Sequence, residues 1–135
     1  MHVSDWRKRS LLTRFRAGVS PLRIETGRYE ANGSGTRGIP AHDRICLCCG
    51  LGVESELHMF IDCPLYDEIR KLLINVCTLY NEGQQDIDLH INITSPSQFF
   101  INTMQCTDYY ICNAVADYIW SAFEIRAKYL ESVTS

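Results

Sequence analysis

The sequence predicts a small domain that is mainly α-helical. Apolar residues recur at spacings of three and four in several stretches, which is the pattern of amphipathic helices. A length of 135 residues is enough for one domain with a buried core. An apolar content of 46% beside 21% charged residues is ordinary for a soluble globular protein. We therefore expect the whole chain to form one domain of packed helices.

The N-terminal part, residues 1–30, is predicted to form a basic helix followed by an extended segment. The helix spans residues 4–18, with Ser4 and Asp5 as candidate N-caps, and a glycine and a proline end it. Its apolar face comprises Leu11, Leu12, Phe15 and Val19. Residues 22–29 are expected to be extended, with a turn at a glycine. Residues 31–43 are rich in glycine and small polar residues, which predicts a flexible loop.

The C-terminal part, residues 65–135, is predicted to be a helical region. Its first helix follows Pro64, which suits a first helical turn, and ends near residue 83. The apolar stripe of this helix comprises Leu65, Ile69, Leu72, Val76 and Leu79. Residues 83–96 are polar and irregular, and a short alternating stretch there is compatible with a strand or an extended loop.

Two further helices are expected over residues 95–106 and 108–131. The second has a stripe that comprises Ile111, Val115, Tyr118, Ala122, Ile125 and Tyr129. A stripe of this length is more often one face of a helical bundle than a coiled-coil seam. No stretch of eighteen apolar residues occurs, so we expect no membrane span and no membrane partner.

Residues 44–64 carry a cysteine and histidine motif with the spacing C-x2-C-x8-H-x4-C. Its members are Cys46, Cys49, His58 and Cys63. Two cysteines separated by two residues can bind one ion from a turn, and four thiolate and imidazole donors are what a tetrahedral Zn²⁺ site requires. Four protein ligands leave no position for water, so we expect one structural Zn²⁺ and no catalytic metal. The alternative is a set of buried free cysteines beside one core histidine.

The fold class that results is a small helical domain, mainly α, with one CCHC zinc-bound turn and room for a short β-hairpin. Cys48 leaves the ligand set open, because it is close enough in sequence to replace either neighbouring cysteine. Arg44 is a candidate partner for a metal-bound thiolate. The cysteines at 77, 106 and 112 are expected in the core.

Charge is distributed unevenly along the chain. Residues 1–44 hold nine Lys/Arg and four Asp/Glu, which gives +5, whereas residues 45–135 hold four Lys/Arg and twelve Asp/Glu, which gives −8. A basic front half could contact phosphates. The alternative is that the basic half packs against the acidic half, and the sequence leaves both interpretations open.

Several short segments together resemble the zinc-binding region at the C-terminal end of reverse transcriptases from non-LTR (LINE-like) retrotransposons. The resemblance covers about residues 10–73. The segments are Leu12-Thr-Arg14-Phe15-Arg16, Ile24-Glu25-Thr26-Gly27-Arg28-Tyr29, Arg44-x-Cys46-x-x-Cys49, Glu54-Ser55-Glu56-x-His58 and Cys63-Pro64-x-Tyr66-x-x-x-Arg70. The stretch from Ala31 to Thr36 departs from the family pattern as an apparent insertion.

The resemblance implies a non-catalytic module that assists RNA or DNA binding beside a polymerase whose motifs this chain does not contain. Neither a Tyr-x-Asp-Asp polymerase motif nor a restriction-like nuclease motif is present, so we expect no enzyme activity. The chain looks like a detached C-terminal fragment or a small protein derived from one. The candidate nucleic-acid contacts are Arg7, Lys8, Arg9, Arg14, Arg16, Arg23, Arg28 and Arg37 for phosphates and Tyr29 for base stacking.

A different class of function is also compatible with the sequence. The zinc would then only stabilise the fold, and the apolar stripe of the C-terminal helix would bind a protein partner. In either case we expect a monomer inside the cell, in the nucleus or cytoplasm, because the N-terminus has no secretory signal and seven cysteines suit a reducing compartment.

Overall fold

A computed structural model describes residues 5–28 and 38–134 of the chain. The fold is mainly helical, as the sequence predicts. The described residues contain no sheet, and the short β-hairpin reduces to one antiparallel bridge between Ile45 and Val53. In chain order the elements are α1 (Trp6–Arg16), α2 (Arg23–Thr26), η1 (Ala41–Asp43), η2 (His58–Asp62), η3 (Pro64–Tyr66), α3 (Asp67–Gly83), η4 (Ile87–Leu89), α4 (Pro96–Gln105) and α5 (Tyr109–Thr134).

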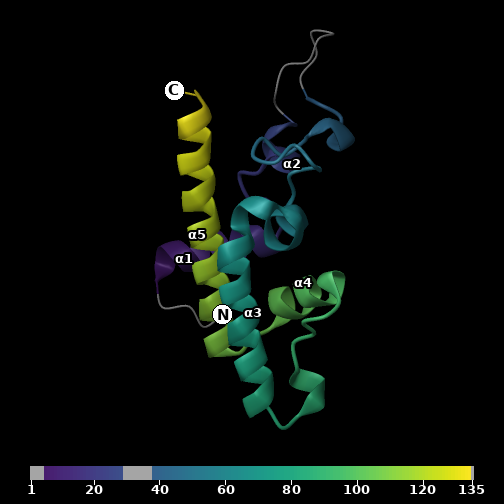
Figure 1. The fold of residues 1–135 in the computed structure, drawn as a ribbon, viewed down its shortest axis with the longest axis vertical. Coiled ribbons are helices and arrows are strands. Elements are labelled where there is room, and N and C mark those ends of the chain that lie inside the picture. Colours follow the sequence, from purple (N-terminus) through teal and green to yellow (C-terminus); the bar gives the residue numbers. More distant parts are fainter. Residues whose placement is uncertain (1–4, 29–37, 135) are drawn as a thin grey trace.

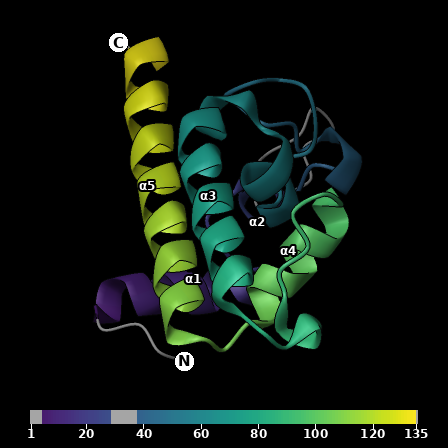
Figure 2. The same cartoon turned by 60° about the horizontal axis from the view of Figure 1, so that its bottom comes forward.

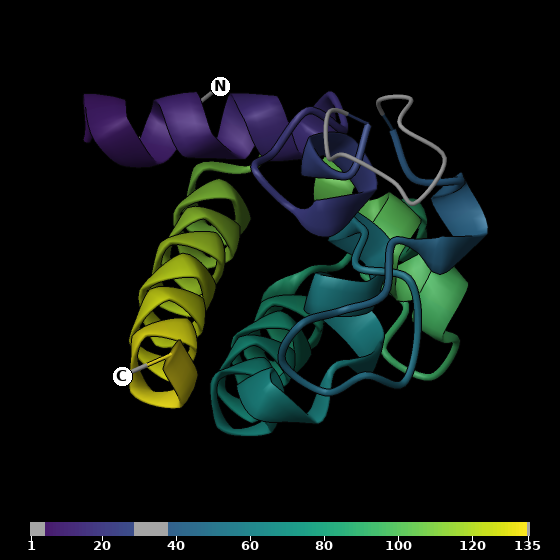
Figure 3. The same cartoon turned by 90° about the horizontal axis from the view of Figure 1, so that it is seen from above.

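Two long antiparallel helices, α3 and α5, form the main body of the fold (Figures 1 and 2). Helix α1 crosses the N-terminal part of α5, so that the basic helix lies at one edge of the molecule (Figure 3). Helix α4 packs on α5 and on the single turn of η2. No helix among the described residues is long and apolar enough to span a membrane.

Polar residues start three of the predicted helices where the sequence places them. The side chain of Asp5 accepts a hydrogen bond from the backbone N–H of Arg7 at 2.9 Å, which satisfies one unpaired donor of the first turn of α1. Ser95 precedes Pro96 and caps α4 in the same way. The carboxylate of Asp108 accepts the backbone N–H of Tyr110 at 2.9 Å at the start of α5.

The core surrounds the ring of Phe60, which lies in η2. This ring contacts Phe99, Phe100 and Tyr118 at centroid distances of 5.6, 5.6 and 5.0 Å, and Phe15 of α1 at 6.2 Å. Aromatic side chains bury large apolar areas and stabilise one another at such distances. The core therefore joins α1, α4 and α5 around the segment that carries His58 and Cys63.

Two expectations about the elements are wrong. Residues 22–29, expected to be extended, include the short helix α2, which begins where the backbone N–H of Arg23 bonds the buried carboxylate of Glu54 at 2.8 Å. Helix α3 also turns only part of the predicted stripe inward, since Ile69 and Val76 pack partly against the core. Its buried residues are Arg70, Leu73 and Cys77, whereas Leu72 and Leu79 are 64% and 62% exposed.

Candidate metal centre

A tight turn positions the first two candidate ligands. The Ile45–Val53 bridge brings the two ends of the turn together, and the backbone N–H of Cys46 donates to the carbonyl of Gly52 at 2.8 Å. Gly50 donates back to the carbonyl of Cys46 at 3.0 Å and has a φ of 68°, in the left-handed region that favours glycine. The turn therefore directs the side chains of Cys46 and Cys49 toward one point.

A single turn of π-helix positions the other two candidate ligands, His58 and Cys63. Cys63 donates its backbone N–H to the carbonyl of His58 at 2.8 Å, the i→i+5 bond that defines this conformation. In an α-helix, residues five apart would point about 140° apart. The wider turn instead brings His58 and Cys63 to the same side. The helical path ends at Cys63, where ψ is 121°, just before Pro64.

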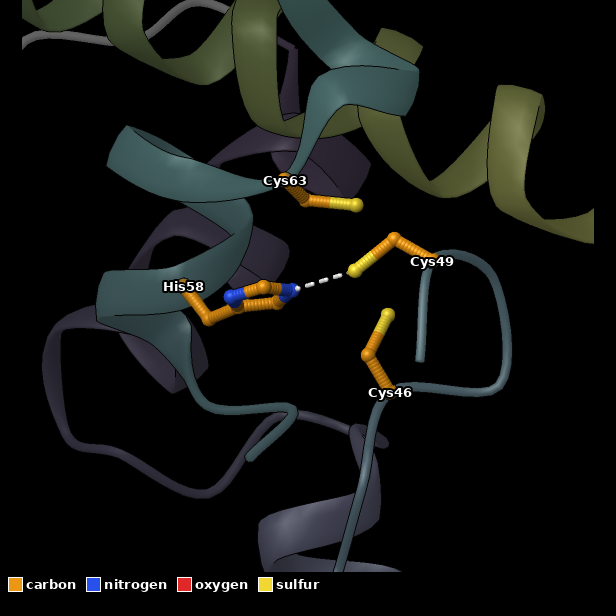
Figure 4. A group of neighbouring side chains, drawn as sticks. All are labelled: Cys46, Cys49, His58 and Cys63. Atoms are coloured by element: carbon orange, nitrogen blue, oxygen red, sulfur yellow. Dashed lines mark hydrogen bonds between the residues drawn. The ribbon is translucent and has the colours of Figure 1, made fainter. Parts of the chain in front are cut away.

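The four candidate ligands converge (Figure 4). One donor atom from each of Cys46, Cys49, His58 and Cys63 lies within 4.8 Å of every other, and the Nε2 atom of His58 is 3.2 Å from the sulfur of Cys49. A tetrahedral Zn²⁺ with Zn–S bonds of about 2.3 Å requires sulfurs about 3.8 Å apart. The donors are therefore near the spacing that a metal ion needs, and three sulfurs with one imidazole suit Zn²⁺.

Burial affects the protonation of these donors. It raises the pKa of the Cys46 and Cys63 thiols above the ordinary value and lowers the pKa of the His58 imidazole. A neutral imidazole can bind a metal directly, whereas the thiols lose their protons when the metal binds. Burial disfavours the negatively charged thiolates unless a positive charge lies beside them. A bound metal ion would supply that charge, so the donor set is compatible with a metal site.

Two buried side chains hold the π-helical turn in place. The guanidinium of Arg70 donates to the carbonyls of Phe60 at 2.9 Å, Cys63 at 2.9 Å and Met59 at 3.3 Å. The hydroxyl of Tyr118 donates to the carbonyl of Met59 at 2.8 Å. Carbonyls that a π-helical turn leaves unpaired thus find donors from α3 and α5. The position of two ligands depends on these contacts.

A buried ion pair lies against Cys46. Glu54 is 1% exposed, and its carboxylate accepts two hydrogen bonds from Arg126 of α5, at 2.8 and 2.9 Å. The thiol of Cys46 lies 3.6 Å from the same carboxylate. Although burial alone would raise the pKa of Glu54, the hydrogen bonds and charge of Arg126 hold it below the ordinary value. Arg126 thus connects the C-terminal helix to the candidate metal centre.

Cys48 is not a member of the convergent set. Its sulfur belongs to a second group of neighbouring donors, with Cys46 and Glu54. Burial raises the pKa of its thiol to about 11. Within the described residues the structure therefore favours the ligand set with Cys49 over the alternative with Cys48.

Arg44 does not contact a candidate ligand thiolate as expected. Its side chain lies over Gly27 and donates to the backbone carbonyls of Ile39 and Ile24, each at 2.7 Å. A carbon at the Cβ position of Gly27 would lie 2.6 Å from the Arg44 side chain. Arg44 therefore links α2 to the start of the turn that carries Cys46 and Cys49. The charged groups beside Cys46 are those of the Glu54–Arg126 pair.

The candidate nucleic-acid residues fall into three groups. Arg7, Arg9 and Arg14 are exposed on α1, and the guanidinium of Arg7 lies 5.9 Å from the ring centroid of Trp6. Others make contacts within the fold. Lys8 pairs with Asp117 at 2.7 Å, and Arg28 pairs with Glu25 at 3.3 Å. Arg16 donates to the carbonyl of Cys106 at 3.0 Å. Arg23 is half-buried beside Glu54. Tyr29 and Arg37 lie outside the described residues.

The roles of Glu54, Arg126, Arg70 and Tyr118 were not predicted from the sequence. Glu54 and Arg70 lie in the segments that carry the family resemblance, which is the one signal that could have marked them. Arg126 is 72 positions from Glu54 and carries no motif. No protein-family model, curated protein or solved structure matches the chain.

Proposed function

We propose that this protein is a zinc-binding module in which one Zn²⁺, held by Cys46, Cys49, His58 and Cys63, stabilises the fold. The observation that carries the proposal is the convergence of these four donors within 4.8 Å from two separately built backbone turns. Four protein ligands complete a tetrahedral shell, so the ion has a structural role. Zinc in such sites contributes folding free energy directly, since the site does not exist in the unfolded chain.

The chain offers a matched pair of cysteine variants to test this proposal. Cys49→Ser removes a ligand, whereas Cys48→Ser makes the same change one residue away, outside the convergent set. We expect wild type and Cys48→Ser to retain one Zn²⁺ per chain after dialysis against a weak chelator, and Cys49→Ser to lose it and unfold at a lower temperature. Equal zinc content in the two variants would contradict the ligand assignment.

The same module has a surface suited to nucleic acid, and we propose that it contacts single-stranded RNA or DNA. The 11 residues of α1 include no acidic side chain, and its outward face carries Arg7, Arg9 and Arg14. Trp6 is 66% exposed on the same helix. Guanidinium groups beside an exposed aromatic ring can bind phosphates and stack on a base. The resemblance to the reverse-transcriptase region supports the same function.

Charge limits how strong this contact can be. The net charge of −3 opposes nonspecific binding. Lys8, Arg16 and Arg23 make contacts within the fold and are therefore poor candidates for phosphate contacts. With three exposed arginines on α1, we expect weak binding and a plot of log affinity against log salt with a slope of about −2 for a single strand.

Fluorescence anisotropy with a labelled single-stranded RNA across a salt series tests this half of the proposal. Replacing Arg7, Arg9 and Arg14 together by Gln should abolish the binding and its salt dependence. The control replaces Lys71 and Lys128 by Gln, because these exposed residues lie on α3 and α5 and are not candidate contacts. An equal loss in both variants would indicate a general charge effect, and would contradict the assignment of the site to α1.

A further inference from the structure

An apolar row of helix α3 faces outward. Ile69, Leu72, Val76 and Leu79 follow one another at spacings of three, four and three, and Leu72 and Leu79 are more than 60% exposed. The buried residues of α3, Arg70, Leu73 and Cys77, lie on the neighbouring face, and Ile69 and Val76 also pack partly against the core. Leu72 and Leu79 therefore form an apolar surface of α3 that the described residues leave largely exposed.

Helix α5 completes a groove with this row. The two helices lie side by side (Figures 2 and 3). A groove of about 350 Å³ lies between them, and its lining comes from α3 and α5 alone. Tyr110 also lines an adjoining hollow with Leu79, which extends the groove. On the α5 side it is lined by Tyr110, Ala114, Asp117 and Ser121, at spacings of four, three and four. Two adjacent helices that each present residues at alternating spacings of three and four receive a third helix by side-chain interdigitation.

The margins of the groove are mainly acidic. On α3, Glu68 and Glu82 lie two heptads apart next to the apolar row, and both are exposed. On α5, Asp117 and Glu124 are seven residues apart on the side next to the groove, and both are exposed. Asp117 and Glu68 are paired with Lys8 at 2.7 Å and Lys71 at 3.6 Å, and Lys128 lies one helical turn beyond Glu124. Glu82 and Glu124 are thus the acidic groups of the margin for which the described residues show no ion pair. An acidic margin around an apolar floor is complementary to a basic amphipathic helix.

We propose that the α3–α5 groove binds an amphipathic helix of a partner protein, whose apolar seam packs between Leu72, Leu79 and Tyr110 and whose flanking positions carry Lys or Arg. A second copy of this chain is a poorer occupant, because symmetric pairing of the two grooves would bring their acidic margins together. The groove includes neither a candidate metal ligand nor one of the arginines of α1, so the inference does not rest on the proposed function.

The probe for this proposal is a pair of synthetic helices of about three heptads with Leu at the a and d positions. One has Lys at the flanking positions and the other has Glu. We expect the Lys-flanked helix to bind the full-length zinc-loaded protein at least about tenfold more tightly than the Glu-flanked helix in fluorescence anisotropy. Similar affinities for both, or no binding of the Lys-flanked helix at about 100 μM, would overturn the proposal.

Two variants locate the binding surface. Leu72→Ser with Leu79→Ser should weaken binding of the Lys-flanked helix by about tenfold or more. The matched control is Ile87→Ser with Leu89→Ser, which removes two exposed apolar side chains of η4 outside the groove and should leave binding unchanged. Glu68→Lys with Glu82→Lys should shift the preference toward the Glu-flanked helix. The wild type could instead self-associate and not bind the helix, and the Leu72, Leu79 variant could lose this self-association. That result would assign the groove to a second copy and refute the proposal.

Discussion

Removing Arg126 is the perturbation that most sharply tests how the C-terminal helix supports the metal centre. Its guanidinium makes two hydrogen bonds, at 2.8 and 2.9 Å, to a carboxylate that is 1% exposed. Arg126→Met keeps much of the aliphatic length and removes the charge. The Glu54 carboxylate is then left buried beside Cys46 with one backbone donor, the N–H of Arg23 at 2.8 Å.

The expected cost follows from the burial of this pair. Deleting one partner of a buried ion pair destabilises a protein by about 3–5 kcal/mol, because the other charge remains without compensation. The surviving N–H of Arg23 and the 16% exposure of the Arg126 side chain place this pair at the lower end, about 3 kcal/mol. For a domain of this size that loss corresponds to a decrease in Tm of about 10 °C.

Thermal and urea unfolding of the zinc-loaded protein measure this effect, with Arg14→Met as the control for an exposed arginine of α1. The second variant, Glu54→Gln in the Arg126→Met background, should recover about half of the loss, because a neutral amide is cheaper to bury than a carboxylate. A loss below about 1 kcal/mol for Arg126→Met, or no recovery in the double variant, would refute the reasoning.

Three further outcomes are expected. Arg70→Met should destabilise the protein by about 3 kcal/mol, because it removes the guanidinium that donates to the carbonyls of Met59, Phe60 and Cys63. The exposed Lys71→Met should change stability by less than about 0.5 kcal/mol in the same urea titration. Hydrogen bonding to Asp117 raises the pKa of Lys8, so this pair contributes stability below about pH 10 that is lost as the pH rises through the raised pKa. The difference in unfolding free energy between wild type and Asp117→Asn should be about 0.5 kcal/mol at most and should vanish above that pKa. A difference that grows with pH would contradict the pairing. Chelation of the metal should remove amide-exchange protection from residues 40–64 while α3 and α5 keep theirs, and uniform protection would contradict a structural role for the ion.

The sequence predicted the helices because their signals are local. Periodicity and capping residues located α1, α3, α4 and α5 to within a few residues, as the hydrogen bonds of Asp5 and Asp108 illustrate. The spacing of the cysteines and histidine also anticipated that these donors would lie together. Both inferences rest on geometry that a short stretch of backbone imposes by itself.

The sequence could not indicate which apolar face of α3 enters the core. Leu72 and Leu79 are better hydrophobic residues than Arg70, yet Arg70 is buried because the carbonyls of the π-helical turn need donors. The Glu54–Arg126 pair was missed for a similar reason, since its partners meet only after α5 has packed. The predicted extended segment at residues 22–29 is wrong because Glu54 caps a short helix from 31 positions away.

The central claim is tested most directly by the metal content and coordination of the protein purified without chelators. Native mass spectrometry should give one Zn²⁺ per chain, and X-ray absorption at the zinc edge should give three sulfur ligands at about 2.3 Å and one nitrogen at about 2.0 Å. A chain that folds fully with no bound metal, or a shell with four sulfurs that includes Cys48, would contradict the site formed by Cys46, Cys49, His58 and Cys63.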